Sequence, residues 1–241
     1  MPAPAPPATL VARLAAWTGG AVFVAALLYY AWFFFVRLGR PVPPDEAHAL
    51  WPALGVNLLL FGAFAAHHSV MARSGAKRWL AARLAPSLER TAYNWVASLL
   101  FVALCAWWWR VPGLVYELEG AWYGVAVGAQ ALGVAFTLRG AAVLDVFELA
   151  GIRQAHGDTR PPAFRVVGPF RWVRHPIYLG WILIVFGTPL MTVDRLAWAV
   201  ISTAYLLLAI PWEERSLVET FGDTYRDYQR QVRWRVIPFV Y

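Results

Sequence analysis

The chain has 241 residues, of which 60% are hydrophobic and only 15% are charged, and it carries 14 Trp and 10 Tyr. This composition excludes an ordinary soluble domain, in which about a quarter of the residues are charged. The net charge of +7 comes without a basic face on a soluble module, so it does not indicate nucleic-acid binding. Composition therefore predicts an all-α, polytopic integral membrane protein, a helical bundle that forms a single domain over residues 1–241.

Six apolar runs follow one another along the chain, each close to the roughly 20 residues that a transmembrane helix needs. We expect membrane spans at 10–36, 49–71, 91–109, 121–144, 177–193 and 196–212. The last two arise because Asp194 and Arg195 interrupt one long apolar run. At about 17 residues each they are short for spanning, so a re-entrant hairpin is the alternative for this stretch.

Basic residues are distributed unevenly between the two sides of this arrangement. Only four of the 21 Lys and Arg residues fall in the expected outer loops, namely Arg37, Arg40, Arg110 and Arg195. The other 17 lie near the start of the chain, in loops 73–90 and 139–174, and in the C-terminal tail. Because cytoplasmic loops carry the excess of basic residues, both termini are expected to be cytoplasmic and the basic side to contact anionic lipid.

Two local patterns complete the expected architecture. Residues 213–232 place apolar side chains at helical spacing between charges, which predicts an amphipathic cytoplasmic helix that serves as a surface anchor, a lid, or both. Gly124 and Gly128 form a small-residue motif in the fourth span, which favours close helix packing.

Ionisable and polar side chains gather at the expected cytoplasmic ends of four spans, where such groups are functional candidates. They are His67, His68, Arg139, Asp145, Glu148, Arg153, Gln154, Arg174, His175, Glu213 and Glu214. Carboxylates would bind an ammonium or ribose hydroxyls, an arginine would bind a carboxylate, and Tyr178 or a nearby tryptophan would stack on a purine. S-adenosylmethionine is one ligand that needs all of these partners. The neighbouring His67 and His68 diverge on a helix, so no metal site is expected there.

Several motifs together indicate a family. The segment RHPIYLG (174–180), followed by EERSLVETFGDTYRDYQRQV (213–232), resembles the C-terminal core of the isoprenylcysteine carboxyl methyltransferase superfamily. HHSVMAR (67–73), LERTAYNWVASL (88–99), ELAGIRQAH (148–156) and TPLMTV (188–193) resemble its nurim-like branch, which includes bacterial methanethiol S-methyltransferases. The resemblance covers roughly residues 50 to 238.

This resemblance implies a membrane methyltransferase that uses S-adenosylmethionine, with a bacterial inner membrane as the expected location. Cofactor-binding residues carried over from the superfamily are Gln154, His175, Tyr178, Gly180, Glu213 and Glu214. A thiol acceptor must lose its proton, and the candidate bases are His68 and His175. Arg174 is the candidate partner for an acceptor carboxylate.

The methyl acceptor stays open at this point, with a small thiol such as methanethiol preferred. A prenylcysteine carboxylate and a lipid amine are the alternatives among enzymes. A non-enzymatic nurim-like membrane protein is a further alternative, which the intact RHPIYLG and Glu213–Glu214 motifs disfavour. A haem or quinone protein would want histidines facing each other in mid-bilayer, whereas His48 and His156 fall near loops.

Overall fold

The computed structural model describes residues 9–71, 82–84, 86–144, 152–156 and 164–241. Within these ranges the protein is helical apart from one two-stranded ribbon, which confirms the all-α membrane class. The chain divides into two compact units, each described here by itself. The first comprises Met1–Phe33, Leu59–Trp108 and Leu144–Pro162, and the second comprises Phe34–Leu58, Trp109–Val143 and Ala163–Tyr241.

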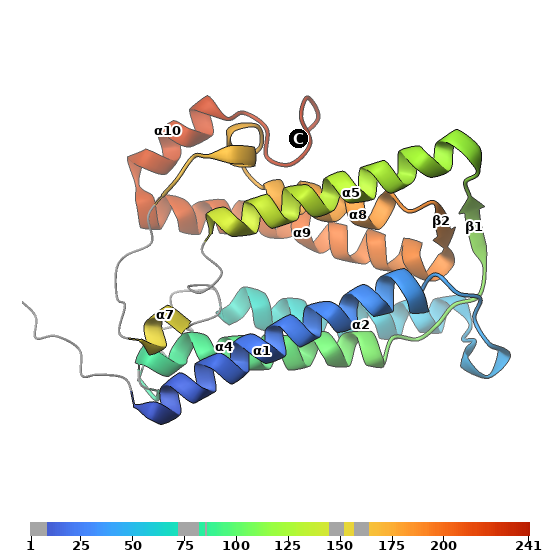
Figure 1. Ribbon diagram of the computed structural model, residues 1–241, viewed down its shortest axis with the longest axis horizontal. Coiled ribbons are helices and arrows are strands. Elements are labelled where there is room, and N and C mark those ends of the chain that lie inside the picture. Colours follow the sequence, from blue (N-terminus) through green and yellow to red (C-terminus); the bar gives the residue numbers. More distant parts are fainter. Residues whose placement is uncertain (1–8, 72–81, 85, 145–151, 157–163) are drawn as a thin grey trace, which may run out of the picture. The chain divides into compact units, whose positions relative to one another are not determined.

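The helices and strands follow the chain in the order labelled in Figure 1. The first unit is built from α1 (Leu10–Trp32), most of α2 (Leu50–Met71), α4 (Pro86–Ala106) and the short α7 (Ile152–Ala155). The second unit holds the π-helical segment η1, apart from its first residue, and the elements η2, β1, α5, η3, α8, β2, α9 and α10. Their bounds are Phe33–Arg37, Pro44–Glu46, Leu114–Glu117, Gly120–Val143, Gly168–Arg171, Pro176–Phe186, Leu190–Thr192, Val193–Phe221 and Asp223–Gln231.

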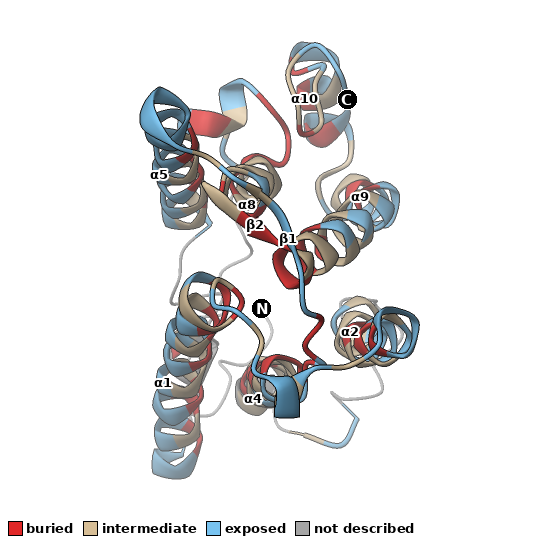
Figure 2. Cartoon of the chain, turned by 90° about the vertical axis from the view of Figure 1, so that its right-hand side faces the viewer, coloured by how far each residue is buried: buried red, intermediate tan, exposed pale blue. Residues whose placement is uncertain are grey.

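Four helical stretches among the described residues are long and apolar enough to cross a membrane: Leu10–Arg37, Leu50–Met71, Gly120–Val143 and Val193–Phe221. Their apolar side chains are largely exposed, as Leu59 (76%) and Trp122 (69%) illustrate. Figure 2 shows the exposed residues of α5 on the side away from α8. Exposed apolar surface of this extent fits contact with lipid chains rather than water.

The remaining two expected spans differ from their predicted form. α4 has 21 residues but begins with the polar sequence around Glu89 and Arg90, which lowers its hydropathy. α8 has only 11 residues, about 16 Å of helix, and ends at Phe186, well before the predicted end of its span at 193. Gly187 caps it and Pro189 follows, and a residue before proline avoids the helical conformation. The six-span count is therefore approximate.

α9 corrects the predicted end of the last span. The helix begins at Val193, where the hydroxyl of Thr192 accepts a hydrogen bond from the backbone N–H of Arg195 at 3.1 Å. It does not end at residue 212 but continues to Phe221. Gly222, with φ of 57°, separates it from α10. The amphipathic helix predicted for 213–232 is thus split between the end of α9 and all of α10.

The two residues that interrupt the apolar run, Asp194 and Arg195, are buried in the first turn of α9. The carboxylate of Asp194 accepts hydrogen bonds from Nε of Arg110 at 2.6 Å and from the backbone N–H of Val111 at 2.8 Å. The guanidinium of Arg195 donates to the carbonyls of Phe34 and Phe35, at 3.2 and 2.9 Å. These bonds satisfy carbonyls of the π-helical segment, which anchors the beginning of α9 within the second unit.

Within the second unit, α8 lies between α5 and α9 (Figures 1 and 2). Close packing of α5 on α8 depends on glycine: a Cβ on Gly133 would lie 2.6 Å from the carbonyl oxygen of Gly180, and one on Gly140 would lie 2.7 Å from Ile177. At Gly124 and Gly128 a Cβ would meet nothing within 4 Å. The packing interpretation of that motif was therefore wrong, and the contact is made further along α5.

Candidate functional site

A buried ion pair joins the start of α8 to the end of α9. Nε of Arg174 lies 2.6 Å from Oε1 of Glu214, and Nη2 lies 3.3 Å from Oε2, so the contact is bidentate. Both side chains are more than 90% buried. Arg174 is the last residue but one before α8, and Glu214 lies in the part of α9 beyond the predicted span. The tertiary fold therefore pairs two of the residues singled out in the sequence.

The same arginine holds the C-terminal segment in place. Nη1 of Arg174 donates to the carbonyls of Val232 and Arg233, at 2.8 and 3.0 Å. The backbone N–H groups of Arg174 and His175 donate to the carbonyls of Trp234 and Arg235, at 2.9 and 2.8 Å. These hydrogen bonds occupy most of the guanidinium. Arg174 is thus engaged by the protein itself, and its placement does not favour the predicted role as partner for an acceptor carboxylate.

Glu214 is the centre of this network. Besides Arg174, it accepts a hydrogen bond from Nε2 of Gln229 at 3.2 Å and forms an ion pair with Arg235 at 3.5 Å. Nε2 of His175 lies 3.3 Å from its Oε1. A buried carboxylate with this many donors is stabilised in its ionised form and has little capacity left for a ligand. Both carboxylate oxygens of Glu214 are thus engaged within the protein, and its predicted contact with the cofactor stays a prediction.

Glu213 is adjacent in sequence but has a different environment. Its side chain is 45% exposed, and Oε2 accepts a hydrogen bond from the hydroxyl of Tyr178 at 2.7 Å. Nδ1 of His175 lies 3.6 Å from the same oxygen. The rings of His175 and Tyr178 are stacked, with centroids 5.2 Å apart and an interplanar angle of 18°. Tyr178, His175 and Glu213 therefore form a cluster with a carboxylate accessible to a ligand.

His175 stands between two carboxylates. Each of its ring nitrogens faces a carboxylate oxygen, one from Glu213 and one from Glu214. The contact with Glu214, at 3.3 Å, is within hydrogen-bond distance, and the one with Glu213, at 3.6 Å, is longer. The geometry favours a role in positioning the Glu213 carboxylate and the Tyr178 ring.

Two buried tyrosines of α10, Tyr225 and Tyr228, pack against the segment that precedes Arg174. Tyr225 and Tyr228 are buried and pack with Phe164 and Val232 in one apolar cluster. The hydroxyl of Tyr228 donates to the carbonyl of Phe170 at 2.7 Å. Burial raises the pKa of both phenols above the ordinary tyrosine value. These contacts attach α10 to the segment that precedes Arg174, so this part of the tail packs on the protein.

Gly180, expected to border the cofactor, instead faces α5. A Cβ at this position would lie 2.6 Å from the carbonyl oxygen of Gly133 and would also meet Thr137. The missing side chain therefore permits close approach of a helix rather than of a ligand. A role of Gly180 in cofactor binding stays a prediction without direct support from its surroundings.

The remaining predicted site residues belong to the first unit. His68 lies near the end of α2 and is exposed, and its Nδ1 is 2.6 Å from the hydroxyl of Tyr93 on α4. The ring of His67 stacks on Tyr93, with centroids 5.7 Å apart. Gln154 lies in α7, and its side chain falls outside the described part of the structure. Asp145 and Glu148 also lie outside the described residues.

Sequence reasoning missed three contributors to the site. Gln229 and Arg235 bind Glu214, and Tyr228 holds the segment before Arg174. The helical spacing of the tail identified Tyr228 as an apolar-face residue but indicated no partner for it. Gln229 lies among charged residues that are typical of a solvated face, so its contact depends on where α10 folds back.

The arrangement has the features of a site for a polar cationic ligand. An accessible carboxylate stands beside a stacked aromatic pair, and a buried ion pair keeps both in position. Carboxylates accept hydrogen bonds from ammonium and hydroxyl groups, and aromatic faces attract cations. The site can therefore hold a ligand with amine or hydroxyl donors.

Comparison with known proteins identifies the family of this chain. The profile of the family described as Phospholipid methyltransferase matches residues 123–224, which include Arg174, Tyr178, Glu213 and Glu214. The chain is 39% identical over 201 residues to Methanethiol S-methyltransferase of Mycobacterium tuberculosis, covering 79% of this chain and 82% of that protein. It is 37% identical over 223 residues to Methanethiol S-methyltransferase 2 of Bradyrhizobium diazoefficiens, covering 88% and 84%. It is also 29% identical over 181 residues to the Nurim homolog of Drosophila melanogaster, covering 70% and 71%.

The bacterial similarities extend over most of both chains, well beyond the segment around the site. The more distant nurim similarity agrees with the branch indicated by the sequence motifs. Catalysis by this family requires a methyl donor. The chain is an integral membrane enzyme and belongs to the methyltransferase family that contains the methanethiol S-methyltransferases.

Proposed function

We propose that this enzyme transfers a methyl group from S-adenosylmethionine to methanethiol, with dimethyl sulfide and S-adenosylhomocysteine as products. The choice of methanethiol as the methyl acceptor rests on the 37–39% sequence identity to two methanethiol S-methyltransferases over most of the chain. Prenylcysteine carboxylates and lipid amines are the competing acceptors. We place the enzyme in a bacterial inner membrane with both termini in the cytoplasm, on the distribution of basic residues.

The residues of the site fit S-adenosylmethionine. Glu213 offers an exposed carboxylate oxygen to the amino group or the ribose hydroxyls. The stacked rings of His175 and Tyr178 offer an aromatic face to the adenine or the sulfonium. Glu214 and Arg174 support these groups from behind without contacting the ligand.

The donor supplies a methyl group that is already activated on a positively charged sulfur. In the overall exchange the acceptor sulfur forms a bond to the methyl carbon, the bond from that carbon to the donor sulfur breaks, and the thiol proton is released. The protein must therefore align the acceptor in line with the methyl group, exclude water and receive the proton. A small volatile thiol needs no binding group beyond a narrow apolar space.

For the proton we retain His68 as the candidate base and assign Tyr93 to its orientation. The hydroxyl of Tyr93 lies 2.6 Å from Nδ1 of His68, a contact that would orient the imidazole ring. His175, with both ring nitrogens against carboxylates, is the weaker candidate. The expected result is that His68→Ala lowers kcat at neutral pH and that the loss shrinks as pH rises toward the thiol pKa. A uniform loss at every pH would remove His68 as the base.

The acceptor is tested directly with purified protein in detergent, labelled S-adenosylmethionine, and a panel of methanethiol, a prenylcysteine analogue and a lipid amine. Headspace analysis should detect dimethyl sulfide with wild-type protein and not with Glu213→Ala. Methyl transfer to the prenylcysteine, with no dimethyl sulfide formed, would reverse the assignment. Reporter fusions after residue 76 and after residue 241 should both report a cytoplasmic location, and a fusion at residue 119 should not.

A further inference from the structure

A pocket of about 350 Å³ lies in the second unit, outside the cluster proposed for S-adenosylmethionine. Residues of α5 form one wall, namely Leu132, Ala135, Phe136 and Arg139. Residues of η3 and the next residue along the chain form the other, namely Gly168, Pro169, Arg171 and Trp172. None of these residues belongs to the ion-pair network around Glu214 or to the Glu213 cluster. The pocket is a separate feature of this unit.

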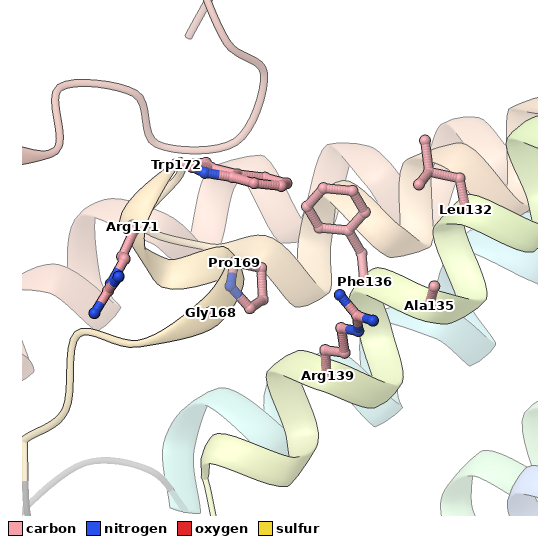
Figure 3. A pocket seen from close by; sticks show the side chains of 8 residues that line it. All are labelled: Leu132, Ala135, Phe136, Arg139, Gly168, Pro169, Arg171 and Trp172. Atoms are coloured by element: carbon pink, nitrogen blue, oxygen red, sulfur yellow. The ribbon is translucent and has the colours of Figure 1, made fainter.

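The pocket combines an apolar surface with two positive charges. The ring centroids of Phe136 and Trp172 lie 5.9 Å apart, and Figure 3 shows the two rings side by side along one edge of the pocket. In the same view Arg139 and Arg171 extend on either side of Pro169. The lining residues include no Asp or Glu. The pocket therefore offers an apolar surface and two guanidinium groups to the same ligand.

Neither guanidinium is used by the rest of the described protein as an ion pair. No carboxylate among the described residues lies within 4.0 Å of Arg139 or Arg171. Arg171 makes one long hydrogen bond, from Nε to the carbonyl of Val166 at 3.5 Å. Both side chains are exposed, in contrast with the buried Arg174, Arg110 and Arg195. Their charge is available to an external anion.

The pocket lies near the C-terminal end of α5, where the apolar part of this helix gives way to Arg139. Leu132, Ala135 and Phe136 belong to the apolar part of this spanning helix, and Arg139 follows within the last turns before Val143. Trp172 is 65% exposed, and tryptophan prefers the level of lipid headgroups. The apolar wall would thus face acyl chains and the arginines would face headgroup phosphates.

We propose that this pocket binds an anionic phospholipid. Arg139 and Arg171 would hold its phosphate, and the part of an acyl chain nearest the headgroup would pack against Phe136 and Trp172. Charge complementarity selects the occupant, because two cations without a neighbouring carboxylate favour a phosphodiester of net negative charge. The ammonium of a zwitterionic lipid would find no carboxylate among the lining residues. This site is independent of the identity of the methyl acceptor.

The test is native mass spectrometry of the full-length protein in neutral detergent. The protein is titrated with phosphatidylglycerol and, separately, with phosphatidylcholine of the same acyl chains. Wild-type protein should prefer phosphatidylglycerol, and R139Q/R171Q should bind it about 30-fold more weakly, with a smaller loss for phosphatidylcholine, whose phosphate is balanced by its own ammonium. Phe136→Ala should weaken both lipids alike, since the acyl chain is common to them.

The matched control is R226Q/R230Q, which removes two exposed arginines of α10 that form ion pairs with Asp223 and Asp227. This variant has the same change in charge and should keep the preference for phosphatidylglycerol. An equal loss in both double variants would show that net charge alone attracts the lipid, and would overturn the proposal. The proposal would also be overturned if glycerol phosphate, added at the same concentration as phosphatidylglycerol, displaced the lipid completely. That result would indicate a site for a free anion, which needs no acyl chain. Unchanged melting temperatures establish that each variant is folded.

Discussion

Glu213 and Glu214 are consecutive residues of α9 with opposite environments. The side chain of Glu214 is 6% exposed and lies 2.6 Å from Arg174, whereas that of Glu213 is 45% exposed and accepts a hydrogen bond from Tyr178. Consecutive residues on a helix point about 100° apart, so one carboxylate can face the protein and the other a ligand. The two carboxylates therefore differ in environment, and separate substitutions should distinguish the roles proposed for them.

Glu213→Gln should weaken binding of S-adenosylmethionine by tenfold or more and leave the melting temperature close to that of wild type. The reason is the loss of a charge-assisted hydrogen bond, which typically contributes about 1.5–3 kcal/mol. Isothermal titration of the folded protein measures the effect. Glu219→Gln, an exposed carboxylate of the same helix, is the control and should bind normally. Normal affinity of Glu213→Gln would exclude Glu213 from the cofactor site.

Glu214→Gln should instead destabilise the protein, by about 3–5 kcal/mol, because it leaves the guanidinium of Arg174 buried without its anion. Loss of methyl donor binding should accompany the loss of structure. Thermal unfolding in detergent, with proteolysis of the C-terminal segment as a second measurement, checks the result.

Asp223→Asn gives the contrast for the Glu214 prediction, since it breaks an exposed ion pair with Arg226 and should have almost no effect on melting. A double-mutant cycle with Arg174→Met and Glu214→Gln should show strong coupling. Additive effects of the two substitutions would mean that their contact does not stabilise the fold.

Gly180→Ala should lower stability, because its Cβ would lie 2.6 Å from the carbonyl oxygen of Gly133 on the facing helix. Overpacking of this kind typically costs about 1–3 kcal/mol. Gly124→Ala, also in a helix but with nothing within 4 Å of its Cβ, should be neutral or slightly stabilising. Thermal unfolding of the two variants decides the matter. A Gly180→Ala protein of normal stability that fails to bind S-adenosylmethionine would return Gly180 to the cofactor pocket.

Stability should fall in alkaline solution through Tyr225 and Tyr228. Their pKa is raised in the folded protein by burial, so the unfolded chain releases these protons first as pH rises past about 10. The contribution of both groups is therefore intact below that pH and declines above it. Tyr228→Phe should lose less stability than wild type between about pH 9 and pH 11. Thermal unfolding followed across this range, with tyrosinate absorbance as the second signal, measures the difference. An equal decline in both proteins would exclude Tyr228 as the source.

The sequence by itself determined the class, the family and most of the spans. Apolar runs such as 121–144 need no partner to be recognised, because the cost of burying polar groups in lipid already selects them. It also singled out His175, Tyr178, Gly180, Glu213 and Glu214 as cofactor candidates, since RHPIYLG and the Glu213–Glu214 pair are local patterns. The short α8 was not predicted, because the apolar character of 177–193 continues after the helix has ended at Gly187.

Only the tertiary structure decided which polar residues contact one another and which stay exposed. Arg174 and Glu214 look as available for a ligand as Glu213 in the sequence, and they become buried and paired because the segment at 232–235 folds back onto Arg174. The close approach of α5 to Gly180 likewise could not be seen in the sequence. These outcomes depend on contacts between residues far apart in the chain, and the desolvation of a group is set by the elements that cover it rather than by its neighbours in sequence.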